Sequence, residues 1–179
     1  MAIQQNLTCP MPTNLNPLSP NGFQFSITKI PEVSYFCQEV NLPDITLGVA
    51  DQATPFSDAK IPGEKLVYGE LQLQFLIDED MANYIAVYNW ISALGFPKDK
   101  TQYVTWLEEH DMMNSSELQK GYSDGVLAIL NNTNSPSKAI RFVDMFPTGL
   151  SSITFQSTST DVAYLVGNAS FAYTYYEIE

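Results

Sequence analysis

The clearest pattern along the chain lies between residues 66 and 97, where a period of two changes to a helical period. From Leu71 to Ile77 apolar residues alternate with more polar ones, which is typical of a strand with one buried face. Apolar residues then recur at intervals of three and four, which predicts a helix over residues 79–94. The predicted buried face of that helix consists of Met81, Tyr84, Ile85, Tyr88 and Ile91.

The two ends of this helix are predicted from its flanking residues. Asp78 or Asp80 is expected to cap the N-terminus, where a carboxylate also suits the positive end of the helix dipole. Gly95 followed by Pro97 predicts where the helix stops. The sequence therefore predicts a strand, a tight turn and a helix that packs back on the sheet.

Shorter apolar runs predict a mainly β, α+β fold, namely an antiparallel β-sandwich or split barrel with one flanking α-helix. The first two runs are expected to form a hairpin broken at Pro31, and two later runs to pair across the turn at residues 131–136. The predicted strands, besides residues 71–77, are residues 23–27, 33–40, 126–130, 138–145, 152–157 and 169–178.

Three segments lack a clear period. Residues 1–22 carry four prolines and predict an extended N-terminal arm that is either disordered or laid on a neighbour, whereas residues 23–179 are expected to form a single domain. Residues 41–65 predict a long irregular loop, either a floppy excursion or an arm that grips an adjacent subunit. Residues 98–124 predict a second long loop, with a short helix expected from Tyr103 to Met112.

Composition changes the picture in two ways. Charged residues make up 16% of the chain, against about 25% in typical domains, which favours a subunit whose surface is covered by neighbours. The formal net charge is −12, and the 8 basic residues form no run. A dedicated nucleic-acid binder is therefore disfavoured, although an acidic surface that nucleic acid slides past is compatible with this charge.

Candidate chemistry is sparse. His110 is the only histidine and has no second His or Cys at metal-ligand spacing, so we expect it in a solvated loop. The chain lacks a phosphate-binding glycine loop and a nucleophile elbow, so no catalytic, cofactor or metal site is expected. Cys9 and Cys37 are either two reduced thiols or one disulfide. No signal peptide or membrane span is predicted.

Several segments in order resemble one known family. They are FQFSI (23–27), CQEVNLPDI (37–45), Pro62-Gly63, FLIDEDMANYIAVYNWI (75–91), LSSITF (150–155) and ASFAYTYYEI (169–178). This order resembles the tail-tube superfamily of contractile-tailed bacteriophages, and within it the tail-completion proteins of T-even-like phages, which terminate the tail tube and stabilise the sheath. Residues 98–136 contribute nothing to the resemblance.

The resemblance implies a structural, non-enzymatic virion protein of the phage tail and neck, assembled in the host cytoplasm. It implies a homohexameric ring that caps the contractile tail tube, stops its growth and contacts the sheath terminator or neck. Double-stranded DNA would pass through the ring without specific binding, and acids on the bore would repel its phosphates. The alternatives are the tube protein itself or a baseplate tube initiator of the same fold.

Interface residues are expected in three places. The N-terminal arm and residues 44–65 are expected at contacts between subunits, and residues 78–90 on the outer surface of the ring. Trp90, on the predicted helix, is either a packing residue or an interface anchor. The candidate interface residues are Leu42, Pro43, Asp44, Pro55, Phe56, Lys60, Pro62, Gly63 and Trp90.

Overall fold

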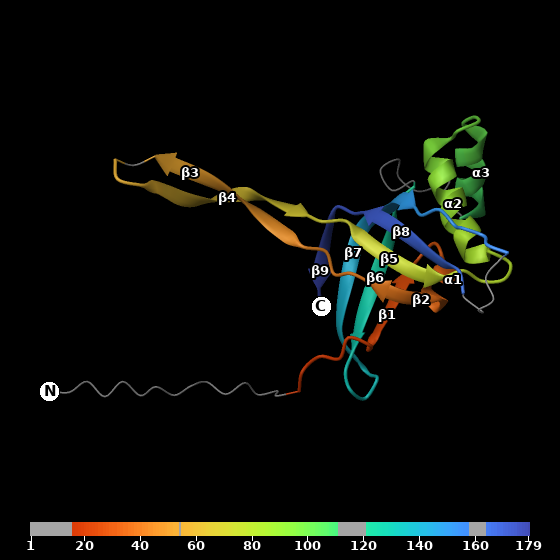
Figure 1. Ribbon diagram of the computed structural model, residues 1–179. Helices are drawn as coiled ribbons and strands as arrows, with labels where there is room; N and C mark the ends of the chain where they lie inside the picture. Colours follow the sequence, from red (N-terminus) through yellow and green to blue (C-terminus); the bar gives the residue numbers. More distant parts are fainter. Residues whose placement is uncertain (1–15, 54, 111–120, 158–163) are drawn as a thin grey trace.

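The computed structural model describes residues 16–53, 55–110, 121–157 and 164–179 (Figure 1). A strand-rich body carries two helices, α2 and α3, and a long two-stranded ribbon projects away from it. The elements in chain order are β1 (Phe23–Ile27), α1 (Pro31–Tyr35), β2 (Cys37–Val40), β3 (Ile45–Ala53), β4 (Asp58–Tyr68), β5 (Leu71–Leu76), α2 (Ala82–Gly95), α3 (Thr101–Glu109), β6 (Ser123–Leu130), β7 (Pro136–Leu150), β8 (Val166–Ala172) and β9 (Tyr175–Ile178).

Seven strands form the body, in the order β1-β6-β7-β8-β5-β2, and β9 pairs with β7. Every ladder is antiparallel. The long strand β7 joins the two halves, because its first part pairs with β6 and β9 and its last part, Phe146–Leu150, pairs with β8. The predicted fold class, mainly β with antiparallel strands and flanking helix, is therefore confirmed.

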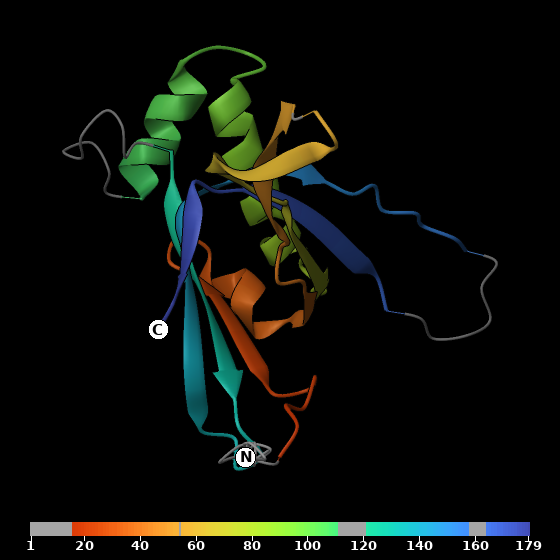
Figure 2. The same ribbon diagram turned by 90° about the vertical axis from the view of Figure 1, so that its left-hand side faces the viewer.

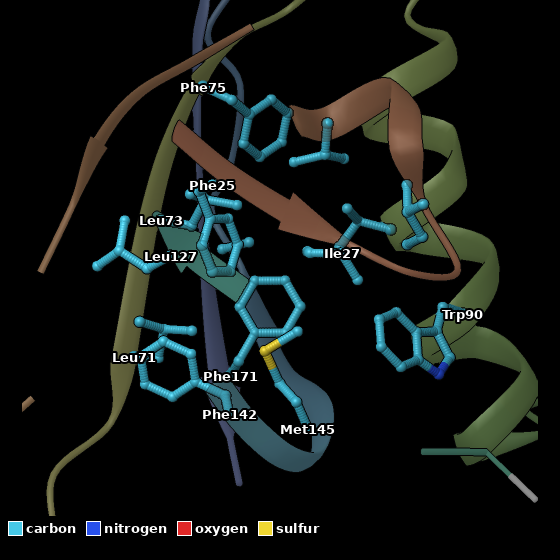
Figure 3. Close-up of a cluster of buried hydrophobic side chains, with 14 of the residues drawn as sticks. Phe25, Ile27, Leu71, Leu73, Phe75, Trp90, Leu127, Phe142, Met145 and Phe171 are labelled. Atoms are coloured by element: carbon cyan, nitrogen blue, oxygen red, sulfur yellow. The ribbon is translucent and has the colours of Figure 1, made fainter. Parts of the chain in front are cut away.

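The core lies between the two halves of the sheet (Figure 3). The rings of Phe25 on β1 and Phe142 on β7 meet edge to face, with centroids 6.4 Å apart. The strand predicted from residues 71–77 is β5, and its alternation is confirmed because Leu71, Leu73 and Phe75 are all buried. Burial of these apolar side chains is the main stabilising contribution of the fold.

Helix α2 lies where the sequence predicts a helix, but its fully buried side chains are not those of the predicted face. The buried side chains are Asn83, Val87, Trp90 and Ala93, whereas Ile85 and Tyr88 are 46% and 55% exposed. Of the predicted face, Tyr84 and Ile91 are partly buried against the core, and the prediction was wrong for Ile85 and Tyr88. The helix, ANYIAVYNWISALG, is apolar around most of its circumference, so periodicity alone selects no single face. The core selects the row that carries the large indole of Trp90.

The predicted acidic cap of α2 is also wrong. The helix begins after Met81, which has a left-handed backbone with φ of 55°, and neither Asp78 nor Asp80 occupies the N-cap position. The link to the preceding strand is made instead by the buried amide of Asn83, which donates a hydrogen bond to the carbonyl oxygen of Leu76 at 2.7 Å. At the other end, the helix stops at Gly95 as predicted.

The segment between β1 and β5 differs from its prediction in two ways. Residues 31–35 form the short helix α1 and only Cys37–Val40 form a strand, because Pro31 occupies the first turn of a helix, where a missing N–H costs nothing. The expected hairpin of the first two strands is absent, since β1 pairs with β6 and β2 pairs with β5. These strands lie at opposite ends of the sheet order.

Residues 41–65 are not an irregular loop. Strands β3 and β4 pair antiparallel from Ile45↔Tyr68 to Ala53↔Asp58, with a register shift between Leu47 and Val49. Pro62 is compatible with this ribbon because each strand has only one neighbour, so a missing N–H can face solvent. We call residues 45–68 the hairpin arm; it forms the ribbon that projects from the body in Figure 1.

The last third of the chain is partly as predicted. Strands β6 and β7 pair across the turn at residues 131–136, which the side chain of Asn131 stabilises by accepting bonds from the Thr133 and Ser135 amides. Residues 152–157 form no strand. The expected closing strand is divided into β8 and β9. Strand β8 pairs with the last part of β7, whereas β9 pairs with residues 140–143 of the same strand. Between them, the Thr174 amide donates a hydrogen bond to the Val143 carbonyl oxygen.

The region after α2 contains the short helix α3, which overlaps the expected helix but begins two residues earlier and ends at Glu109; residues 111 and 112 of the expected helix lie outside the described residues. Figure 2 shows α2 and α3 side by side at one end of the molecule and the β6–β7 turn at the other. The indoles of Trp90 and Trp106 stack between these helices, with centroids 6.0 Å apart and ring planes 11° apart. The N-terminal arm, apart from residues 16–22, lies outside the described residues.

Candidate assembly surfaces

The hairpin arm carries much of the exposed apolar surface of the described chain. Within the arm, Ile45 and Leu47 lie on one side of β3, Leu66 stands opposite Leu47 on β4, and Val49 follows the register shift. Phe56 at the tip is 100% exposed. The exposed large apolar residues of the arm are Ile45, Leu47, Val49, Phe56, Ile61, Leu66 and Val67.

Such a ribbon is not stable by itself. An isolated two-stranded hairpin is marginally stable in water, and exposed apolar side chains gathered on one segment are typical of surfaces that contact other proteins. The ion pair between Lys60 and Asp51 is exposed on both sides and contributes little. The close approach of the strands at Gly63 leaves no room for a side chain, since a Cβ there would meet the Gly48 carbonyl oxygen at 2.6 Å.

An aromatic cluster anchors the base of the arm to the body. The ring of Tyr68, the last residue of β4, packs edge to face on Tyr173 and Tyr176, with centroids 6.0 and 5.5 Å away. The Tyr176 hydroxyl donates a hydrogen bond to the Pro43 carbonyl oxygen at 3.3 Å. Burial, followed by the neighbouring Tyr176, raises the pKa of Tyr173 to about 12. These contacts fix the base of the arm on the body, and the rest of the arm projects from the body.

The structure places eight of the nine predicted interface residues on or next to this arm. Leu42, Pro43 and Asp44 precede β3, and Pro43 is buried there. Pro55 and Phe56 lie at the exposed tip, and the other three, Lys60, Pro62 and Gly63, lie on β4. Their role in an interface stays a prediction. The sequence reasoning missed the apolar residues of β3, although the alternation of Ile45, Leu47 and Val49 was a readable signal.

Trp90 is the exception. Its side chain is 0% exposed and its indole N–H donates to the Gly121 carbonyl oxygen at 2.9 Å, so it is a core residue and not an interface anchor. Figure 3 shows Trp90 pointing from α2 into the cluster of buried side chains. The interpretation as an anchor was wrong because the sequence alone did not fix which face of α2 is buried.

A cation lies over the same indoles. The ammonium of Lys29 sits 4.8 Å from the Trp106 ring centroid and 5.8 Å from that of Trp90, a favourable cation–π geometry. Burial lowers the pKa of Lys29 to about 8, against a smaller raising effect of the Asp124 carboxylate. His110 is not in a solvated loop: its ring packs on Trp106 with centroids 4.5 Å apart.

A polar hollow of about 320 Å3 lies on the open face of β2, β5 and β8. Its lining is dominated by uncharged amides and hydroxyls and holds a single carboxylate and no basic residue. The lining residues are Glu39, Asn41, Gln72, Leu73, Gln74, Asn168, Ala169 and Ser170. Such a surface offers hydrogen bonds but has no cation that would bind a phosphate tightly.

Ligand chemistry is limited in the part of the chain that the structure covers. Its described residues contain no group of three or more His, Cys, Asp or Glu side chains placed to hold a metal ion. None of the described helices is both long and apolar enough to cross a membrane. Cys37 is a free thiol whose pKa is raised to about 11 by burial, and Cys9 lies outside the described residues.

Comparison with known proteins gives consistent matches. The family model described as "Phage tail tube protein" matches residues 6–179. The tail tube terminator protein of Enterobacteria phage T4 is 28% identical over 171 residues, which cover 92% of this chain and 90% of that protein.

Two solved structures have the same fold. One is the tube-terminating cap of the anti-feeding prophage, with a TM-score of 0.64, 16% identity, and coverage of 97% of this chain and 98% of that one. The other is from the baseplate of the anti-feeding prophage, with a TM-score of 0.61, 14% identity, and coverage of 92% and 96%. Because the family model spans nearly the whole sequence, the chain belongs to the phage tail tube protein family.

Proposed function

We propose that this protein is a structural, non-enzymatic virion component that terminates the tube of a contractile phage tail. The observation that carries the proposal is the near full-length similarity to a relative named as a tail tube terminator. The fold alone does not select this role, since a baseplate structure and a terminating cap match it about equally well.

The proposed assembly is a ring of six copies at the neck end of the tail tube. Neighbouring sheets would join at their edges, which removes free strand edges by closure, and β2 offers such an edge because it pairs only with β5. The hairpin arm would reach a neighbouring subunit or the last ring of the tube. Its exposed apolar side chains would then become buried, which supplies the favourable free energy that the isolated arm lacks.

The partners proposed for the remaining surfaces follow from their position and chemistry. The tail-tube protein would contact one side of the ring, and the sheath terminator or neck proteins the other side. The exposed residues Ile85 and Tyr88 on α2 are candidates for the outer surface. The polar hollow on β2, β5 and β8 would face the channel, where amides and hydroxyls let double-stranded DNA pass without specific binding.

The alternative within the family is a tube protein or a baseplate tube initiator. The similarity of fold to a baseplate structure is the observation that favours this alternative. The three roles differ in one property: a terminator adds to a finished tube end, whereas a tube protein polymerises by itself and an initiator nucleates growth. A tube-growth experiment therefore separates them.

The experiment adds the purified protein to growing tubes of the tail-tube protein from the same phage and records tube length by electron microscopy. A terminator shortens the tubes in proportion to its concentration and forms no tubes alone. Longer or more numerous tubes would support the tube-protein or initiator role instead. Replacing Leu47 and Leu66 by serine should abolish the shortening, whereas serine at Gln52 and Ala59, a pair nearer the tip, should preserve it.

A further inference from the structure

A groove of about 720 Å3 opens beside β1 and β2, the two end strands of the sheet order. Phe23 on β1 and Leu127 and Ile129 on β6 line it, and all three belong to the hydrophobic core or pack against it. Residues 18–22 and strand β2 form its walls. Phe23 and Ile129 are therefore partly open to solvent along this groove, whereas Leu127 is buried behind them.

The lining is half polar, with Ser19, Asn21 and Gln38 beside the apolar side chains, and a segment that covers the apolar half would stabilise the fold. The residues that line the groove include one charged side chain, Glu39. An occupant that fits must therefore be apolar on the side that faces Phe23 and Leu127, and needs no charge. The chemistry favours a short, uncharged peptide segment with apolar residues on one side.

The first fifteen residues of the same chain have this character. They contain no Asp, Glu, Lys or Arg. Their Met, Ile, Leu and Cys side chains all stand at odd-numbered positions, a period of two that places them on one side of an extended segment. These residues are Met1, Ile3, Leu7, Cys9, Met11 and Leu15.

The described chain also begins at the right place. Asn16, Pro17 and Leu18 line a hollow against the β6–β7 turn, and Leu18 also lines the groove. Figures 1 and 2 both show residues 16–22 beside that turn. Nine extended residues span about 30 Å, which is enough to return along a groove of this size. Between this segment and residue 18 the chain contains Pro12, Asn14, Asn16 and Pro17, which are residue types common in turns.

We propose that residues 3–11 fold back into this groove, with their odd-numbered side chains against Phe23, Leu127 and Ile129. The segment then completes the open side of the core in the same subunit. This inference does not depend on the role in the tail, because it concerns the subunit before assembly.

Hydrogen–deuterium exchange of the full chain tests the proposal, with peptides that report on residues 18–23 and 37–42. The first variant replaces Ile3, Leu7 and Met11 by serine, and the matched control replaces Gln4, Asn6 and Thr8 by serine. If the segment fills the groove about 90% of the time, exchange in these peptides becomes about tenfold faster in the odd-position variant only. Equal exchange in both variants and the wild type would overturn the proposal.

A second measurement distinguishes loss of the bound segment from misfolding caused by the substitutions. A chain that lacks residues 2–12 should show the same loss of protection, and a synthetic peptide of residues 1–13 should restore it. Protection in the full chain should not change on dilution. Protection that disappears on dilution, together with dissociation of an oligomer, would mean that the arm of a second copy fills the groove, and would contradict the same-chain assignment.

Discussion

The side-chain amide of Asn83, in the first turn of α2, donates a hydrogen bond to the carbonyl oxygen of Leu76 at the end of β5, with nitrogen and oxygen 2.7 Å apart. The Asn83 side-chain oxygen accepts a second bond from the Tyr84 amide at 2.8 Å, and the side chain is fully buried. This residue therefore fixes the angle between the strand and the helix.

Replacing Asn83 by alanine should lower the free energy of unfolding by about 1–3 kcal/mol, because two backbone groups lose their partner in a region with little water. Urea denaturation of the purified subunit measures this change. Asn89→Ala, at an exposed position on the same helix, is the matched control and should change stability by less than about 0.5 kcal/mol. Equal effects of the two substitutions would contradict the assigned role.

Trp90→Ala should destabilise the subunit by about 3–5 kcal/mol, since it removes a fully buried indole that stacks on Trp106 and contacts the Phe171 ring. Tyr88→Ala, two residues away on the exposed face, should be nearly neutral for the stability of the subunit. Thermal unfolding of both variants checks the pair. A stable Trp90→Ala subunit with an assembly defect would restore Trp90 as an interface anchor.

Gly167 on β8 lies opposite Phe75 on β5, and a Cβ at Gly167 would stand 2.9 Å from the Phe75 ring. Gly167→Ala should therefore cost about 1–3 kcal/mol through overpacking. At Gly149 the nearest atom would be 3.8 Å away, so Gly149→Ala should be close to neutral. Denaturant midpoints of the two variants measure the difference, and a Gly167→Ala midpoint equal to that of the wild type would show that the core can adjust.

The pH dependence of stability should report on Lys29. Its pKa in the folded chain is lowered to about 8 from 10.5, so between these pH values the unfolded chain binds the proton more strongly than the folded chain. The free energy of unfolding contributed by Lys29 should therefore rise from pH 8 to pH 10.5. The comparison with Lys29→Met isolates this contribution, because the other titrating groups are shared. A difference that is flat with pH would contradict the lowered pKa.

The sequence predicted those elements whose period is set by a single buried face. Strand β5 alternates because, within it, only Leu71, Leu73 and Phe75 are buried. The helix that follows ends at Gly95, after which the backbone turns left-handed at Phe96. The fully buried row of α2 was not predictable, because apolar residues surround that helix and the choice depends on what the sheet presents to it. Long-range pairing had to be seen in the structure.

The hairpin arm was likewise predicted only in part. The resemblance indicated an arm near residues 44–65, but prolines and glycines concealed its strand pairing. The alternation of apolar residues in β3 was readable, but no residue of β3 is buried and β4 packs on the body only at Tyr68, so the exposed position of the ribbon could not be read from it. The groove beside β1 and β2 was not predictable either, because it brings together residues from β1, β2 and β6 that are distant in sequence.

The number of copies in each virion tests the proposed function most directly. Quantitative mass spectrometry of purified particles, with a head protein as the standard, measures this number. A terminator that forms one ring should give about six copies, and antibody labelling should place them at the neck and not at the baseplate. A copy number equal to many rings would contradict the proposal and identify the chain as a tube subunit.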